Sequence, residues 1–179
     1  MNTCGTCLIQ PPPLDACVAA LDYAFPWVRL IAELKFQQGL HWVPLLSSLL
    51  ERALPAQLSW PAQACLVPVP LSPERLCERG FNQALELARP LAQRRQYALA
   101  PELLRRTLAT EQQARLDKEA RQRNMHGAFH CPMPLAGRHC VLLDDVMTTG
   151  ATLHEAARSL RRAGAASVSA LVLARTPAP

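Results

Sequence analysis

The alternation of apolar and polar residues is clearest in the last quarter of the chain. An apolar, strand-like run over 139–146 leads into a short loop over 147–151. Residues 152–163 repeat their apolar positions at the spacing of one helix face, and Gly164 is expected to end that helix. A second strand pattern over 167–174 completes a predicted βαβ unit.

The N-terminal half follows the same alternation of strand and helix patterns. Strand patterns cover 16–25 and 64–72, and helix patterns cover 27–39, 42–54 and 79–93. Asn82 is placed to cap the last of these helices, whereas Pro90 is expected to kink or shorten it. Strands that alternate with helices predict an α/β fold with a mostly parallel central sheet flanked by helices. In such a fold the ligand crevice lies at the carboxyl ends of the strands.

Two segments stand outside this regular pattern. Residues 105–130 are mostly polar and long for a connection in a compact domain, which predicts a functional or mobile segment with a short helix at about 116–124. The proline-rich residues 11–15 form a stiff spacer that separates the N-terminal residues from the rest of the chain. The part of the chain after this spacer has the length of one ordinary domain.

Positive charge gathers in the middle of the chain. Residues 75–123 contain eleven Arg and Lys against six Asp and Glu, which accounts for the formal net charge of +5. Such a segment can bind nucleic acid or a small polyphosphate, or it can be a solvated helix face, and charge alone leaves these alternatives open. No apolar run approaches the ~18 residues of a membrane-spanning helix. The start also lacks a secretory signal, so we expect a cytoplasmic protein.

Most of the cysteines are expected to be small buried apolar residues, and one pair has the spacing of a zinc site. There are seven, an odd number in a chain without an export signal, which argues against a disulfide framework. Cys4 and Cys7 form a C-x-x-C pair, a spacing that suits zinc. A closed zinc site needs four ligands and no second pair is present, so the ligand set for Zn²⁺ is incomplete.

The residues VLLDDVMTTGATL, 141–153, carry the strongest chemical signal. A buried strand delivers Asp144 and Asp145 to its carboxyl end, and the Thr-Thr-Gly loop before a helix offers amide donors to an anion such as phosphate. The acids would repel a phosphate alone, and they make sense if the ligand also carries neighbouring hydroxyl groups that donate hydrogen bonds to a carboxylate. The stretch therefore predicts a site for a sugar phosphate. A Walker A loop and the three glycines of a dinucleotide fingerprint are both missing.

A purely structural interpretation of the same residues is simpler. Thr148 and Thr149 can cap the helix, and the acids can favour its dipole. Capping explains one threonine well. It gives no reason for two acids at the end of an apolar strand, because a buried carboxylate is costly without a partner.

The stretch is similar to the motif with which type I phosphoribosyltransferases bind phosphoribosyl pyrophosphate (PRPP). Three further segments occur in the order seen in the competence-associated ComF/GntX family: LIAELKF at 30–36, VPVPLSPERLCERGFNQ at 67–83 and RTLATEQQARLDKEARQRNMHGAF at 106–129. The resemblance covers nearly the whole chain. It implies a type I phosphoribosyltransferase fold over 14–179, with a small hood or lid over about 105–130.

The resemblance also implies roles for the acids and the loop after them. Asp144 and Asp145 would be the catalytic residues that hold the ribose 2- and 3-hydroxyls. The loop that wraps the 5-phosphate would consist of Thr148, Thr149, Gly150, Ala151 and Thr152. Mg²⁺ is expected to bridge the pyrophosphate oxygens and the ribose hydroxyls.

Arg75 and Arg79 come after the 64–72 strand in a predicted loop. They match the position where related enzymes grip pyrophosphate, and a guanidinium group suits that anion. Exposed ion pairs with Glu74 or Glu78 are the structural alternative.

The resemblance assigns Arg106, Gln113 and Arg121 to the hood that closes over PRPP, although as charges on a polar helix they could equally be solvated. The CGTC motif looks like the last knuckle of the zinc ribbon that precedes the transferase body in this family. The earlier knuckles are missing, so residues 1–13 are expected to be a remnant of that ribbon, with Cys4 and Cys7 as a partial zinc site.

Two functions therefore remain open from the sequence. One is a phosphoribosyltransferase that binds PRPP with Mg²⁺ and transfers phosphoribosyl to an unknown acceptor, linked to DNA uptake in natural competence. The other is a non-catalytic binding module that keeps the PRPP pocket and serves competence proteins, such as a helicase or a DNA-processing protein, and single-stranded DNA. A pure nucleic-acid binder would instead be indifferent to PRPP and strongly sensitive to salt.

Overall fold

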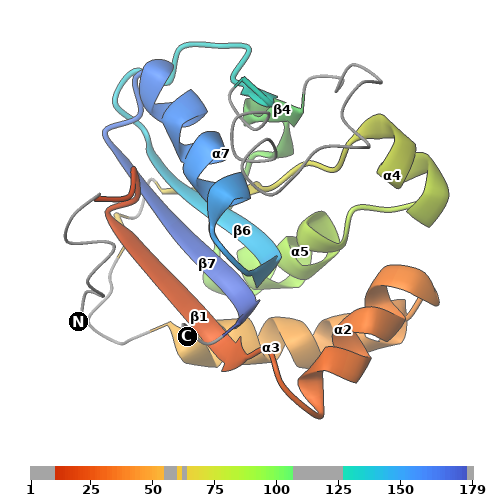
Figure 1. The fold of residues 1–179 in the computed structure, drawn as a ribbon. Coiled ribbons are helices and arrows are strands. Elements are labelled where there is room, and N and C mark those ends of the chain that lie inside the picture. The colour runs from red at the N-terminus through yellow and green to blue at the C-terminus, as the bar shows by residue number, and fades with distance from the viewer. Residues whose placement is uncertain (1–10, 55–59, 62–63, 107–126, 177–179) are drawn as a thin grey trace.

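The computed structural model describes residues 11–54, 60–61, 64–106 and 127–176, and a five-stranded parallel sheet lies at its centre (Figure 1). The strand order is β1-β7-β6-β2-β3, and every neighbouring pair is parallel. The strands are β1 (Ala16–Asp22), β2 (Cys65–Pro68), β3 (Ala98–Leu99), β6 (His139–Met147) and β7 (Ser167–Arg175). The predicted α/β class with a parallel sheet is confirmed.

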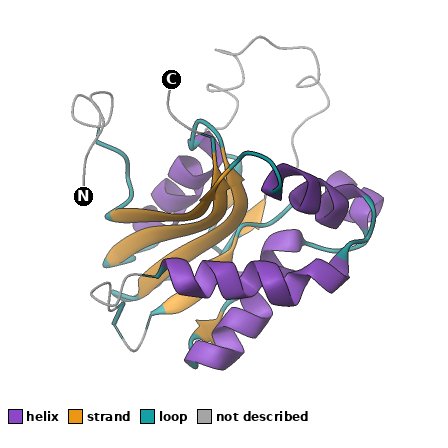
Figure 2. Ribbon diagram, turned by 90° about the horizontal axis from the view of Figure 1, so that it is seen from below, coloured by secondary structure: helices purple, strands orange, loops and turns teal. Residues whose placement is uncertain are grey.

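Helices cover both faces of this sheet (Figure 2). They are α2 (Trp27–Phe36), α3 (Val43–Ala53), α5 (Gln83–Arg95) and α7 (Ala151–Arg162). A further helix, α4 (Pro73–Arg79), has no buried residue, and short 3₁₀ turns lie at Leu40–Trp42 and Pro101–Leu103. Successive strand residues point to opposite faces. Leu142 therefore packs in the core under α7, whereas Val141 and Leu143 pack in the core under α2, α3 and α5. None of the described helices is long and apolar enough to cross a membrane.

Helix α5 begins at Gln83, after the predicted cap Asn82 rather than at residue 79, and ends at Arg95, two residues later than predicted. Asn82 Oδ1 accepts a hydrogen bond from the Ala84 backbone N–H at 3.0 Å, which confirms the cap. Pro90 does not shorten the helix, because α5 continues to Arg95. Leu87 and Leu91 on either side of the proline are fully buried, and their packing offsets the missing N–H.

The arginines predicted to lie in a loop after β2 instead lie on helix α4. Pro73 occupies its first turn, Ser72 Oγ accepts a hydrogen bond from the Arg75 N–H at 3.4 Å, and Gly80 ends it at φ 78°. The prediction of a loop for Arg75 and Arg79 was therefore wrong. A helix holds both arginines at fixed spacing on a short rigid element.

The base of the predicted hood is a small antiparallel ladder. β4 (Arg105–Arg106) pairs with β5 (Phe129–His130), so the two ends of the 105–130 segment lie side by side. The short helix predicted at about 116–124 lies outside the described residues.

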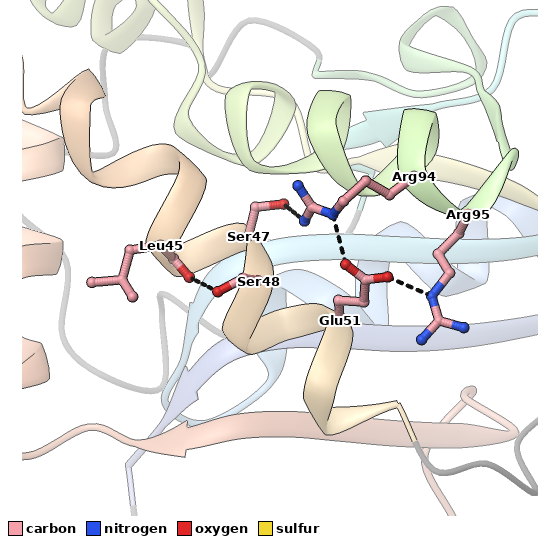
Figure 3. Close-up of polar contacts among 6 residues, drawn as sticks. All are labelled: Leu45, Ser47, Ser48, Glu51, Arg94 and Arg95. Carbon is pink, nitrogen blue, oxygen red and sulfur yellow. Dashed lines mark hydrogen bonds and ion pairs between the residues drawn. The ribbon is translucent and has the colours of Figure 1, made fainter.

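An ion-pair cluster joins α3 to α5 (Figure 3). Arg94 Nε and Arg95 Nε donate to the two carboxylate oxygens of Glu51 at 2.6 and 2.8 Å, and Arg94 also donates to Ser47 Oγ at 2.9 Å. The hydrogen bond from Arg94 is the main cause that lowers the pKa of Glu51. The cluster ties together two helices that pack on the same face of the sheet.

Replacing Glu51 by glutamine is expected to lower the free energy of unfolding by about 1 kcal/mol at pH 7, since the side chains of the pair are partly exposed to solvent. A lowered pKa in the folded state stabilises the protein above the ordinary carboxyl pKa, and this contribution is lost as the pH falls through the folded value. Urea denaturation should therefore show a smaller difference at pH 3. Glu86→Gln, which removes an exposed pair 3.4 Å long, is the control and should change little; an equal effect would contradict the assignment.

Candidate functional site

The end of β6 and the start of α7 enclose a small cavity of about 40 Å³. All five residues predicted to wrap a phosphate line it, together with Asp144: they are Thr148, Thr149, Gly150, Ala151 and Thr152. Thr149 Oγ1 accepts a long hydrogen bond from the Ala151 N–H at 3.4 Å, but the N-cap of α7 is Gly150, and no side chain caps the helix. The predicted loop residues therefore surround one cavity, and Asp144, one of the two acids, also lines it.

Gly150 gives this loop its shape. Its φ is +79°, in the left-handed region that favours glycine. A Cβ at this position would lie 2.6 Å from Met147 Cε and 3.1 Å from His154 Nε2. Met147 and His154 therefore pack closely against the loop, and no sequence pattern had indicated a role for either.

The two acids of β6 point in different directions. Asp144 lines the loop cavity, and its Oδ1 accepts a hydrogen bond from the Asp145 N–H at 2.9 Å. Asp145 is only 4% exposed, and its Oδ2 lies 3.0 Å from Lys35 Nζ of α2. Successive strand residues alternate between faces, which explains why one acid meets the loop and the other meets α2.

Burial raises the pKa of Asp144 well above its ordinary value, and the charge of Asp145 adds to the rise. Lys35 acts in the opposite direction and lowers it. In the free protein the acid pair therefore holds a proton to higher pH than two separate carboxyls would. A ligand that brings hydrogen-bond donors or positive charge to Asp144 would favour its ionised form.

A larger cavity of about 370 Å³ lies between the end of α2 and α4, and we call it the α2–α4 pocket. It is lined by Lys35, Phe36, Gln38, Arg75, Glu78 and Arg79. The Arg79 guanidinium carbon lies 5.2 Å from the centre of the Phe36 ring. Among the described residues, neither arginine forms an ion pair with Glu74 or Glu78, which was the structural alternative for them.

Arg106, at the base of the predicted hood, lies near both cavities, because the charges of Arg75 and Asp144 act on it. Its guanidinium carbon lies 5.5 Å from the centre of the Phe129 ring, across the β4–β5 ladder. Burial lowers the pKa of Arg106, and the nearby charge of Arg75 lowers it further, whereas Asp144 raises it. The guanidinium group therefore lies within electrostatic reach of both an acid of the loop cavity and a cation of the α2–α4 pocket.

Glu155 is a buried acid that sequence reasoning missed. It lies on α7, is 1% exposed, and pairs with Arg158 at 3.0 Å and Arg162 at 3.3 Å. It also accepts a hydrogen bond from the Gly127 N–H at 2.9 Å. Glu155 thus fastens residue 127, near the end of the hood segment, to the helix that starts at the loop cavity.

The remaining predicted residues lie outside the described part of the chain. These are Gln113 and Arg121 of the hood and Cys4 and Cys7 of the partial zinc site. Within the described residues there is no group of three or more His, Cys, Asp and Glu side chains that could hold a metal ion. The zinc and lid assignments stay predictions.

Comparison with known proteins finds one family and several relatives. Residues 84–179 match the family model described as phosphoribosyl transferase domain. The chain is 41% identical over 176 residues to the DNA utilization protein YhgH of Escherichia coli (strain K12), a match that covers 97% of this chain and 78% of that protein. It is 33% identical over 180 residues to Competence protein F of Haemophilus influenzae, covering 96% of this chain and 78% of that protein. It is 42% identical over 112 residues to Competence protein ComFC of Bacillus subtilis (strain 168), covering 62% of this chain and 44% of that protein.

Proposed function

Because this chain belongs to the phosphoribosyl transferase domain family, in the branch of the ComF-type competence proteins, we propose that it binds PRPP together with Mg²⁺ and transfers its phosphoribosyl group. The observation that carries the proposal is the position of Asp144 in the wall of the loop cavity. One cavity thereby offers amide and hydroxyl donors to a phosphate and a carboxylate to neighbouring hydroxyl groups. A ribose 5-phosphate has both kinds of group.

Each part of the site has a function under this proposal. The loop over 148–152 and the N-terminus of α7 bind the 5-phosphate, which replaces its water shell by fixed donors. Asp144 accepts hydrogen bonds from the ribose hydroxyls and stabilises positive charge that develops on the ring during transfer. Arg75 and Arg79 bind the diphosphate from α4.

Mg²⁺ fits this site as part of the ligand complex rather than as a metal held by the protein alone. Asp144 and Asp145 are the carboxylates at the site, and Asp145 already has a cationic partner in Lys35. Asp144 is thus the side chain that would meet the ion. When bound, Mg²⁺ would neutralise part of the charge of the diphosphate.

The names of the relatives, DNA utilization and competence, support a cellular role in the use or uptake of DNA. The excess of basic residues over 75–123 supports binding of single-stranded DNA, and so supports the alternative of a non-catalytic binding module. Release of pyrophosphate from PRPP with a panel of nitrogenous acceptors separates the two. An enzyme releases it with at least one acceptor, and a binding module with none.

Calorimetric titration with ribose 5-phosphate and with 2-deoxyribose 5-phosphate tests the proposed recognition. Both ligands carry the phosphate, but the second lacks one hydroxyl partner for Asp144. We expect about tenfold weaker binding of the deoxy sugar, which corresponds to ~1.4 kcal/mol. Mg·PRPP at a hundredfold excess over its Kd should also stabilise the protein by about 2.7 kcal/mol. Equal affinity for the two sugars, or no stabilisation by PRPP, would argue against the proposal.

A further inference from the structure

The side chains that line the α2–α4 pocket carry a net positive charge, which suits a polyanion. Three cations face it, Lys35, Arg75 and Arg79, against the single carboxylate of Glu78. Neither arginine is engaged in an ion pair with another described residue, so their guanidinium groups are available to a guest. All three cations precede the residues 84–179 that match the family model, and they lie in the segments 30–36 and 67–83 that resemble the ComF/GntX family.

Lys35 differs from the two arginines in its second contact. Its Nζ lies 3.0 Å from Asp145 Oδ2, and the two side chains are 18% and 5% exposed. Lys35 therefore lines the α2–α4 pocket and also pairs with Asp145, one of the two acids of β6. The Lys35 ammonium group therefore contacts a nearly buried carboxylate and also faces an open cavity that is lined by two arginines.

The covalent structure of PRPP determines which part of the ligand would lie near Lys35. The diphosphate of PRPP is attached to C1 of the ribose, next to the C2 hydroxyl that the acid would hold. A group that lies between the acids and the cationic pocket is therefore beside the oxygen that joins the sugar to the diphosphate. Lys35 meets this condition from α2, which is far in the sequence from the 141–153 stretch that contains the acids.

We propose that Lys35 binds the diphosphate group of the ligand and positions Asp145, so that it joins the loop cavity and the α2–α4 pocket into one site. The inference rests on the proposed function. Lys35 supplies a compact, strongly hydrated charge at the junction, while Arg75 and Arg79 reach the diphosphate from α4. Phe36 holds Arg79 toward the pocket by stacking under its guanidinium group.

The test uses inorganic pyrophosphate and ribose 5-phosphate as separate probes, each with Mg²⁺ at one ionic strength, in calorimetric titrations of the full chain. Lys35→Met keeps the length of the side chain and removes its charge. We expect the Kd for pyrophosphate to rise about tenfold and the Kd for ribose 5-phosphate to change less than threefold. Arg94→Gln is the control, because it breaks an ion pair of 2.6 Å between α5 and α3 and should leave both Kd values unchanged.

A double variant distinguishes a loss of pyrophosphate binding from a loss of folding. Lys35→Met leaves Asp145 without its cation, whereas the double variant Lys35→Met/Asp145→Asn removes both charges and leaves no unpaired carboxylate. It should fold and still bind pyrophosphate about tenfold more weakly than the wild type. Wild-type affinity for pyrophosphate in the double variant, or an equal loss for both probes in Lys35→Met, would overturn the role of Lys35. A wild-type protein that binds neither probe would instead overturn the proposed function.

Discussion

Replacing Asp144 by asparagine is expected to weaken binding of Mg·PRPP by about a hundredfold, which is ~2.7 kcal/mol. The asparagine keeps an oxygen that can accept the hydrogen bond from the Asp145 N–H, so the end of β6 should keep its shape. The substitution removes the negative charge that strengthens hydrogen bonds from the ribose hydroxyls and meets the cation of the ligand. Calorimetric titration of the wild type and the variant at pH 8 measures the difference directly.

The same substitution is expected to make the free protein more stable. The pKa of Asp144 is raised in the folded state by burial and by Asp145. A raised carboxyl pKa means that the folded protein loses stability relative to the unfolded chain as the pH rises above about 4 and toward the folded pKa. Asparagine has no such cost. The variant should therefore be more stable than the wild type by about 1 kcal/mol or more at pH 8, and the difference should shrink at pH 4.

Asp145→Asn is the matched control at the next residue. It removes a carboxylate that is paired with Lys35, so it should destabilise the free protein rather than stabilise it. Urea denaturation of both variants at pH 4 and pH 8 compares them. If Asp144→Asn were destabilising at pH 8, or if the two variants behaved alike, the assignment of the protonated acid to position 144 would be wrong.

Gly150→Ala is expected to abolish measurable binding of ribose 5-phosphate at millimolar concentration. A non-glycine residue at φ +79° is strained by ~1–2 kcal/mol, and its Cβ would lie 2.6 Å from Met147 Cε. Met147 can move the end of its flexible side chain, so the main effect is the strain, which the loop can relieve only by turning its backbone donors away from the phosphate. Thermal denaturation without ligand measures the loss of stability, and the increase in Tm that ribose 5-phosphate causes measures binding.

Gly137→Ala separates the loss of binding from the loss of stability. Gly137 has almost the same φ, +80°, but an added Cβ would meet nothing within 4 Å, and the residue lies before β6 rather than after it. It should lower the free energy of unfolding by a similar ~1–2 kcal/mol and leave ligand affinity unchanged. Equal affinities for Gly150→Ala and Gly137→Ala would mean that the loop conformation does not matter for binding.

The sequence predicted the β6–α7–β7 unit to within one or two residues. Its two strands are long and apolar, its helix has one clear apolar face, and Gly164 lies just after the last turn. Elements of this length show a clear hydrophobic period, because their apolar residues are the ones that are buried in the core. The loop residues of the candidate site could be found for the same reason, since they occupy a short stretch between two strong patterns.

Features that depend on distant parts of the chain could not be predicted in this way. Lys35 and Asp145 are 110 positions apart, and only the packing of α2 on the sheet brings them together. β3, β4 and β5 contain two residues each, too few to show a period. Helix α4 had signals in Ser72, Pro73 and Gly80, but its seven residues include no buried apolar position, so no hydrophobic pattern marked it.

A crystal structure of the wild-type protein with Mg·PRPP tests the central claim most directly. The account predicts the 5-phosphate within hydrogen-bond distance of the backbone N–H groups over 149–152, a ribose hydroxyl on Asp144, and the diphosphate in the α2–α4 pocket. A complex in which PRPP binds elsewhere, with the loop cavity closed by its own side chains, would contradict it.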